Sequence, residues 1–189
     1  LRSELTTMLV DAGLFAKAAA FVPDSPTHPD ALLVRAVNLA AAGQIHDAIQ
    51  ALQIPASVSP VRPAALWTLA QCHAAIEQRI ESRDVLSRLL LIQPDHLQAR
   101  LLRARLALEQ RDFGSAAADL SLVLKEEPEN GEALRLQGAL RLSTDRTLDA
   151  LRDLTRMLQN APQDSEALYL RAYALHKLGQ DAEASADLT

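Results

Sequence analysis

Four prolines divide most of the chain into equal lengths. Pro60, Pro94, Pro128 and Pro162 stand 34 residues apart in the 189-residue sequence. Proline has no backbone N–H and disfavours helical geometry in the residue before it, so a helix is expected to end at each of these points. A fixed period of roughly 20–50 residues is the signature of a repeat architecture, in which each unit packs only on its neighbours. The period therefore predicts an array of small units.

Residues of one type recur when the chain is aligned on this period, with each unit starting three residues after a proline. The eighth position is always small and the twenty-fourth is always leucine. The eighth-position residues are Ala36, Ala70, Ala104, Gly138 and Ala172, and the twenty-fourth are Leu52, Leu86, Leu120, Leu154 and Leu188. The twentieth position is also small: Ala48, Ser82, Ala116, Ala150 and Ala184. Small and large side chains on facing positions let two elements interdigitate closely.

Each unit contains two helical stripes separated by a break near its fifteenth position. The apolar spacing i, i+3, i+4, i+7 from Leu66 to His73 is that of one helix face, and Ala116 to Leu124 forms a second stripe. Leucine and alanine contribute 35 and 34 residues, and the aromatic residues only six. This composition favours helix over strand. Each unit is therefore expected to be a helical hairpin, helix A followed by helix B.

The pattern resembles the tetratricopeptide repeat family. Stretches such as Ala133-Leu134…Gly138…Ala150…Leu154…Pro162 carry the resemblance, although the fourth position holds Leu or Arg where the family has Trp. The resemblance implies an all-α fold, an α-solenoid of stacked hairpins forming a right-handed superhelix. It also implies protein binding in a concave groove that is lined by the A helices.

The register predicts six segments. They are a partial hairpin with a proline-rich connector at 1–28, repeats at 29–62, 63–96, 97–130 and 131–164, and a repeat at 165–189 whose helix B is cut short. The chain starts at Leu1 and ends at Thr189 within helical patterns, as expected of a piece of a longer protein. Pro55 is expected to shorten helix B of the 29–62 repeat, which makes 22–29 and 54–63 the candidate hinges.

Charged pairs are predicted between the seventh and twenty-third positions. Arg103 aligns with Asp119 and Arg171 with Asp187, whereas Leu69 aligns with Val85. A partly buried arginine needs a carboxylate, and a leucine needs an apolar neighbour, so the two positions are expected to be in contact. Arg35, opposite Ala51, is the exception. The alternative is that these arginines bind a ligand.

Charge and motif content argue against several function classes. The net charge of −5 provides no basic surplus for nucleic acid, and no apolar run reaches the roughly 18 residues needed for membrane insertion. The single Cys72 excludes an internal disulfide and a cysteine zinc site. Phosphate-loop, nucleophile-elbow and His-Glu-x-x-His motifs are missing. No catalysis, metal or cofactor is expected; Cys72 is predicted to be an inert buried thiol and His73 a core histidine.

The resemblance places a partner-binding groove on one face of the A helices. Its predicted residues are Leu33, Val37, Trp67, Gln71, Leu101, Arg105, Arg135, Tyr169, Tyr173 and Lys177. Trp, Tyr and Arg dominate binding hot spots, and the mixture suggests a peptide with an apolar and an acidic end. The family's Lys/Asn clamp for chaperone tails does not match these positions. The alternative is that Trp67, Tyr169 and Tyr173 only pack between repeats.

The leading function hypothesis is a non-catalytic scaffold or adaptor that holds an extended or helical segment of a partner protein. Two alternatives remain open: self-assembly into dimers or filaments, and a regulatory arm of a larger enzyme or of a secretion or co-chaperone machine. Sixteen Arg against three Lys, with abundant Ala and Leu, suggest a GC-rich bacterial source. The cytoplasm is slightly favoured as the compartment, and the periplasm stays open.

Overall fold

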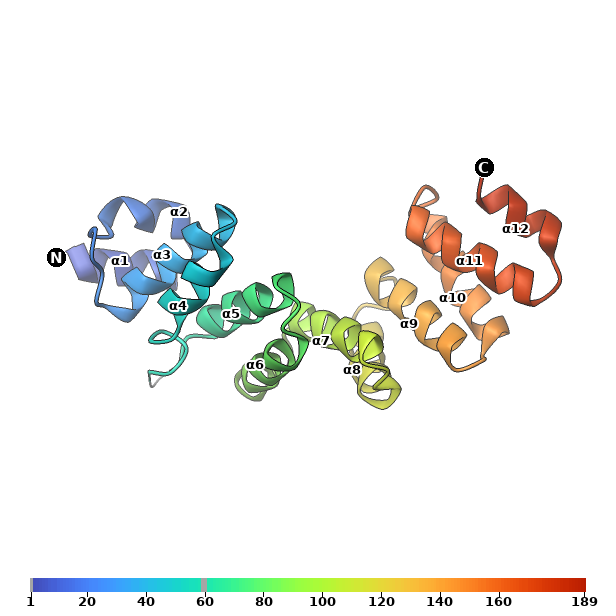
Figure 1. Ribbon diagram of the computed structural model, residues 1–189, viewed down its shortest axis with the longest axis horizontal. Coiled ribbons are helices and arrows are strands. Elements are labelled where there is room, and N and C mark those ends of the chain that lie inside the picture. The colour runs from blue at the N-terminus through green and yellow to red at the C-terminus, as the bar shows by residue number, and fades with distance from the viewer. Residues whose placement is uncertain (1, 59–60) are drawn as a thin grey trace. The chain divides into compact units, whose positions relative to one another are not determined.

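The computed structural model describes residues 2–58 and 61–189, so Leu1 and the repeat marker Pro60 lie outside the described residues. All regular structure in the described part is helical (Figure 1). The first helices are α1 (Arg2–Asp11), α2 (Phe15–Ala18) and the short 3-10 helix η1 (Ala19–Phe21). The later helices are α3 (Pro29–Ala41), α4 (Ile45–Leu52), α5 (Pro63–Ala75), α6 (Arg79–Ile92), α7 (Leu97–Glu109), α8 (Phe113–Glu126), α9 (Gly131–Ser143), α10 (Thr147–Asn160), α11 (Ser165–Lys177) and α12 (Asp181–Asp187).

The helices pack as consecutive pairs within two compact units. The first unit, Leu1–His96, contains α1 to α6, and the second, Leu97–Thr189, contains α7 to α12. In the first unit α3 pairs with α4 and α5 with α6; in the second α7 pairs with α8, α9 with α10 and α11 with α12. Each pair is thus a hairpin of an A helix and a B helix, as the period predicts.

The starts of the A helices follow the 34-residue period. They begin at Pro29, Pro63, Leu97, Gly131 and Ser165. A side chain caps α9 and α11, because the carboxamide oxygen of Asn130 accepts from the amide N–H of Ala133 at 2.9 Å and the carboxylate of Asp164 accepts from that of Ala167 at 2.8 Å. Such caps satisfy N–H groups that the first turn leaves without an intrahelical acceptor.

The turn inside each hairpin contains one residue in the left-handed region. Gly43 and Gly179 provide it in two hairpins, whereas Glu77, Arg111 and Asp145 adopt φ of 60°, 58° and 57°. Left-handed backbone costs a residue with a Cβ about 1 kcal/mol or more. The recurring turn is therefore imposed by the packing of the two helices, even where no glycine is present.

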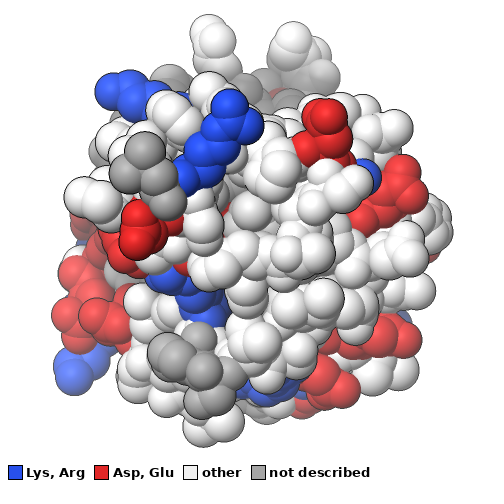
Figure 2. Space-filling view, turned by 90° about the vertical axis from the view of Figure 1, so that its left-hand side faces the viewer, with Lys and Arg blue, Asp and Glu red and all other residues white. Residues whose placement is uncertain are grey.

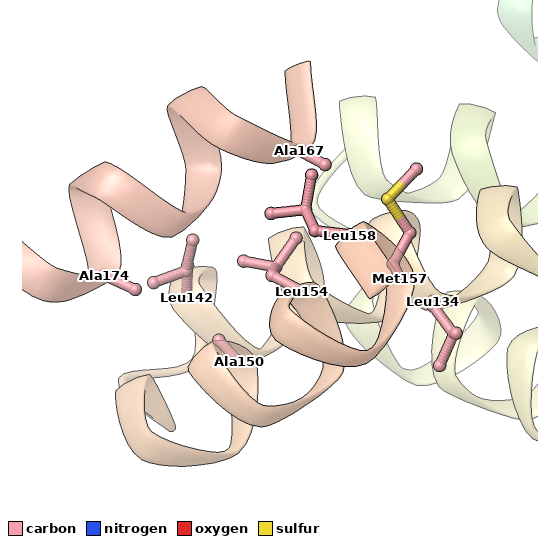
Figure 3. Packing of buried hydrophobic residues seen from close by; sticks show 8 residues of the cluster. All are labelled: Leu134, Leu142, Ala150, Leu154, Met157, Leu158, Ala167 and Ala174. Carbon is pink, nitrogen blue, oxygen red and sulfur yellow. The ribbon is translucent and has the colours of Figure 1, made fainter. Parts of the chain in front are cut away.

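The core of the second unit lies between neighbouring hairpins. Figure 3 shows Leu142, Leu154 and Leu158 of the α9–α10 hairpin beside Ala167 and Ala174 of α11. All five side chains are at most 8% exposed. Helix α11 thus covers the apolar face that α9 and α10 form together, and α9 covers α7 and α8 through Ala133, Leu136 and Leu140.

Two details of the first unit follow from its sequence. Helix α4 has 8 residues against 14 in α6 and α8, because Pro55 stands three residues after its last residue, Leu52, and prevents its extension. The prediction of a core His73 is wrong: the side chain is partly exposed, and its Nδ1 lies 2.6 Å from Oε1 of Gln78. His73 bonds across the hairpin turn because Gln78 is the first residue beyond it.

Helices α9 and α10 approach each other closely at Gly138. A Cβ added there would lie 2.7 Å from Cγ of Leu154, whereas one added at Gly114 in α8 would meet nothing within 4 Å. We expect Gly138→Ala to be less stable than Gly114→Ala by about 1–3 kcal/mol, because overpacking opposes the gain in helix propensity that both share. Chemical denaturation of the two variants measures this difference. Equal unfolding free energies would contradict the close contact.

Candidate functional site

The structure pairs the charges of the seventh and twenty-third positions. In the α7–α8 hairpin, Nε of Arg103 donates to Oδ2 of Asp119 at 2.7 Å and Nη2 donates to Oδ1 at 2.8 Å. The α11–α12 hairpin repeats this geometry, with Nε of Arg171 at 2.7 Å from Oδ2 of Asp187. These hydrogen bonds raise the pKa of both arginines, more than burial lowers it. In these hairpins the charges therefore hold helix A to helix B.

A second arginine at the Asp119 site was missed by the sequence reasoning. Nη1 of Arg100 donates to Oδ1 of Asp119 at 3.0 Å, and the Asp119 side chain is only 3% exposed. Arg100 occupies the fourth position, where the other units from Leu32 to Leu168 hold leucine. That single departure from an apolar column was the available signal. One buried carboxylate thus accepts from two guanidinium groups.

Asp153 at the twenty-third position of the α9–α10 hairpin takes a different partner. It lies opposite Gln137, and its Oδ2 is 2.5 Å from Nη1 of Arg141, the eleventh residue of the same unit. Burial raises the pKa of Asp153 above its usual 3.8, and the attraction of Arg141 offsets only part of this. The carboxylate is therefore less well compensated than that of Asp119.

The predicted groove residues of the first unit separate into buried and accessible ones. Leu33 is 0% exposed, so its assignment to a binding surface is wrong: it is a core residue of α3. Val37 and Trp67 are partly buried, and Gln71 is exposed. The Trp67 ring packs on His96, with centroids 5.2 Å apart and planes tilted by 40°. Both residues belong to the 63–96 repeat, so this contact does not decide between a groove role for Trp67 and packing between repeats.

The predicted groove arginines of the second unit are already paired within it. Nη2 of Arg105 donates to Oε1 of Glu132 at 2.5 Å, and Arg135 forms an ion pair with Glu166. Each glutamate is the second residue of the following A helix, so the pairs link successive A helices. These contacts neutralise the charge that was expected to select an acidic peptide. The fifth-position Leu101 is 1% exposed, which corrects its assignment to the groove as well.

Two of the predicted residues on α11 are exposed tyrosines. Tyr169 is 62% and Tyr173 47% exposed. Nζ of Lys177 bonds Oδ1 of Asp145 at 2.8 Å and lies 5.9 Å from the centroid of the Tyr173 ring. The structure therefore brings Tyr169, Tyr173 and Lys177 together on one helix.

These tyrosines border an apolar cavity of about 290 Å³ between α11 and α12. Its lining is Tyr169, Ala172, Tyr173, His176, Asp181, Ala184, Ser185 and Leu188. His176 and Asp181 are within hydrogen-bond distance of each other, 2.7 Å from Nδ1 to Oδ1. Leu188, the twenty-fourth position of this hairpin, is 63% exposed, whereas its counterparts Leu120 and Leu154 are 0% exposed. We call this surface the α11–α12 face.

A larger cavity of about 530 Å³ in the first unit has a polar centre that is satisfied from within. It lies beside His28 and Val61, and its buried carboxylate is Asp30. Oδ2 of Asp30 accepts from Oγ1 of Thr7 at 2.6 Å and from Nη2 of Arg62 at 3.1 Å. This network joins α1, α3 and the residue before α5, and it serves structure.

Surface charge, helix length, metal-ligand grouping and the single cysteine bear on the function classes that the sequence argued against. On the side of the molecule that Figure 2 presents, acidic and basic side chains are interspersed among uncharged ones instead of forming one basic patch. Among residues 2–58 and 61–189, none of the helices combines the length and apolar character required to cross a bilayer. The described part holds no group of three or more His, Cys, Asp or Glu side chains arranged for a metal ion. Cys72 is 2% exposed, and burial raises the pKa of its thiol.

A testable prediction follows from the Asp119 cluster. Asp119→Ala should destabilise the protein by about 1–3 kcal/mol, because Arg100 and Arg103 lose a buried acceptor. The apolar equivalent exists in the α5–α6 hairpin as Leu66, Leu69 and Val85, so Arg100→Leu/Arg103→Leu/Asp119→Val should recover most of the loss. A thermodynamic cycle of Arg103→Leu and Asp119→Val measures the coupling. Zero coupling would reject a stabilising role for the pair.

The opposite pKa shifts of two neighbouring carboxyls give a pH prediction. A carboxyl whose folded pKa is raised opposes folding at neutral pH, and the penalty disappears as the pH falls through that pKa. Asp153→Asn should therefore stabilise the protein relative to wild type at neutral pH, by an amount that shrinks as the pH falls through the raised pKa and is lost below about pH 4.

Asp149 provides the control, because its hydrogen bond with Arg146 lowers its pKa. Its contribution is present above the unfolded pKa and is lost as the pH falls through the folded one, so Asp149→Asn should destabilise at neutral pH and converge with wild type in acid. Urea denaturation between pH 3 and 7 tests both variants. The same sign for both would contradict the assignment.

Comparisons with known proteins agree with the helical hairpins. A tetratricopeptide repeat family model matches residues 75–131, 101–147 and 136–188. A solved tetratricopeptide repeat protein from Parabacteroides merdae is 18% identical, with a TM-score of 0.76 over 98% of this chain and 75% of that one. MamA (residue 41 to the end) from Desulfovibrio magneticus is 13% identical, with a TM-score of 0.80 over 86% of this chain and 92% of that one. At these identities the likeness establishes the fold alone.

No curated protein sequence matches the chain. The family model nevertheless spans more than half of its length, and the fold agrees with it. The chain therefore belongs to the tetratricopeptide repeat family, whose members are generally protein-interaction modules.

Proposed function

We propose that this protein is a non-catalytic interaction module that binds an amphipathic helix of a partner protein on its α11–α12 face. The observation that carries the proposal is the exposed apolar cavity of about 290 Å³ bordered by Tyr169 and Tyr173. Concave, mostly apolar sites with a few polar groups are typical of binding sites. Tyrosine adds contact area at low entropic cost.

The repeat register supports a helix as the occupant. The α9–α10 hairpin has an equivalent face, built from Leu142, Ala150 and Leu154, and this face is covered by α11. The α11–α12 face carries His176, Ala184 and Leu188 at the same three positions. A surface that repeats a helix-binding surface is suited to the same kind of ligand.

The chain also indicates which pattern such a helix should present. Helix α9 packs on the preceding hairpin through Ala133, Leu136 and Leu140, and α11 through Ala167, Leu170 and Ala174. Both sets follow small-x-x-Leu-x-x-x-apolar spacing, which lies on one face of a helix. The small residue allows close approach, and the leucine fills the space beside the twenty-fourth-position leucine. We expect the partner helix to follow this pattern.

The polar groups around the face set its border. Lys177 is bonded to Asp145, and Arg135 is paired with Glu166 on α11. These paired charges keep the rim solvated without selecting strongly for an acidic ligand. The proposed partner is therefore chosen by its apolar stripe, with Tyr169 and Tyr173 as the anchors.

Self-association is the second candidate, supported by α1. In the repeat register Met8 occupies the tenth position, like Leu140 and Ala174, and it is 68% exposed. A copy of α1 docking on the α11–α12 face of another molecule would bury it. Glu4, however, stands at the sixth position, where Leu136 and Leu170 make apolar contacts. Helix α1 thus matches the required pattern less well than α9 or α11 does.

Binding of a defined helix tests the proposal. The probe is a stapled, fluorescent peptide of residues 164–178 of this chain, and the measurement is fluorescence anisotropy. Leu188→Ala should weaken binding severalfold, since burying a leucine side chain is worth about 1.5–3 kcal/mol when it is fully covered. Leu148→Ala is the matched control, because Leu148 is 68% exposed on α10 outside the α11–α12 face.

Equal affinities for wild type and Leu188→Ala would reject this face as the binding site. Light scattering over a concentration series addresses the second candidate separately. A monomer at high concentration would rule out self-association and leave the helix-binding proposal in place. A dimer that Leu188→Ala dissociates would instead identify a second copy as the occupant.

A further inference from the structure

The α3–α4 hairpin lacks the carboxylate that binds the seventh-position arginine in two other hairpins. At the seventh position it carries Arg35, as the α7–α8 hairpin carries Arg103 and the α11–α12 hairpin Arg171. The twenty-third position, aspartate in those two hairpins, is Ala51 here. Arg35 thus occupies the position that Arg103 and Arg171 occupy in their hairpins. The aspartate that accepts from those two arginines is missing here.

A cavity occupies this place. It has a volume of about 470 Å³ and is lined by Leu32, Arg35, Leu39, Gln44, Asp47, Gln50 and Ala51. Truncation of an aspartate to alanine at the twenty-third position leaves room for the carboxylate group that Asp119 and Asp187 supply in their own hairpins. The cavity is therefore where an external carboxylate would take the position of an internal one.

Arg35 has donor capacity to spare. Its hydrogen bond in the described structure is a long one, from Nη1 to the carbonyl oxygen of Asp24 at 3.4 Å. Within residues 2–58 and 61–189 no carboxylate forms an ion pair with it, whereas Arg103 binds Asp119 through two hydrogen bonds of 2.7 and 2.8 Å. A guanidinium has five N–H donors arranged to grip a carboxylate with two of them.

We propose that this cavity is a second binding site, which takes the acidic side chain of a partner peptide. An Asp or Glu of the partner accepts two hydrogen bonds from Arg35, in the geometry that Asp119 makes with Arg103. The site lies on α3 and α4 in the first unit, and it neither uses nor requires the α11–α12 face. It goes beyond helix binding by adding a requirement for a carboxylate.

The other polar residues of the cavity favour a peptide over a small free acid. Asp47 lines the same space and repels an anion that brings nothing else. In a peptide, the residues next to the acidic one also bring backbone N–H groups. These groups are able to donate hydrogen bonds to the carboxylate of Asp47 and to the side-chain amide oxygens of Gln44 and Gln50. Leu32 and Leu39 supply apolar surface for the neighbouring side chain. The expected ligand is an acidic residue followed or preceded by an apolar one.

The Nε–Hε NMR signals of the arginines report on this site directly. The probes are the blocked peptide acetyl-Leu-Asp-Ala-amide, its Asn analogue and succinate. The Asp peptide should shift the Arg35 signal saturably, the Asn analogue should not, and succinate should bind severalfold more weakly. The Arg103 signal should stay unchanged, because its carboxylate position is filled by Asp119.

Three variants decide the outcome. Ala51→Asp supplies the missing carboxylate from within and should weaken peptide binding at least tenfold, while Asp47→Asn should strengthen it severalfold. Arg35→Gln should abolish the response, read from the Gln44 and Gln50 amide signals.

Two results would overturn the proposal. One is a non-saturable shift shared with Arg152, whose side chain is 75% exposed and which would report general attraction of anions. The other is peptide affinity in folded Ala51→Asp equal to that of wild type. A stronger response to succinate than to the Asp peptide would assign the site to small dicarboxylates and reject the peptide.

Discussion

The contact between a small residue at the eighth position and the leucine at the twenty-fourth is the constraint on which the other features depend. It sets the distance between helix A and helix B, as the close approach of Gly138 to Leu154 illustrates. Once that distance is short, the chain must reverse within very few residues, and the left-handed turns at Glu77, Arg111 and Asp145 follow despite their cost. The same approach places the seventh and twenty-third positions face to face. Charge pairing is thus a consequence of the apolar contact.

The contact between the seventh and twenty-third positions is built from different residues in different hairpins. The α5–α6 hairpin avoids charge with Leu69 and Val85, which are 5% and 7% exposed. The α7–α8 hairpin satisfies Asp119 with two arginines, and the α9–α10 hairpin leaves Asp153 with Arg141 and a raised pKa. Since a buried ion pair often contributes little net stability compared with apolar packing, the first and second solutions can coexist in one protein.

Much of this was accessible from the sequence, because a repeat repeats its contacts. The 34-residue period located the starts of five A helices, and comparing columns identified the partner of Arg103. Which of the predicted groove residues are exposed to solvent could not be predicted from the sequence in the same way. Leu33 and Leu101 occupy predicted groove positions, yet both side chains are buried, at 0% and 1% exposed. Arg105 and Arg135 are paired by glutamates of the following A helix, so their availability depends on contacts between repeats. The partner of Asp153 lies off the repeating columns, and no period would reveal it.

Both proposed sites arise where one member of a repeating set of contacts is missing. On the α11–α12 face none of the described helices covers Leu188, which is 63% exposed, whereas its counterparts Leu120 and Leu154 are buried. In the α3–α4 hairpin the missing member is a carboxylate. Arg35 therefore lines a cavity, whereas Arg103 and Arg171, at the same position of their hairpins, are bound by aspartates. In a repeat protein, equivalent positions of different hairpins are directly comparable. A hairpin in which the contact is complete shows which group is missing from a hairpin in which it is not. The chemistry of the expected ligand follows from that comparison: an apolar stripe with a small residue in the first case, and an acidic side chain in the second.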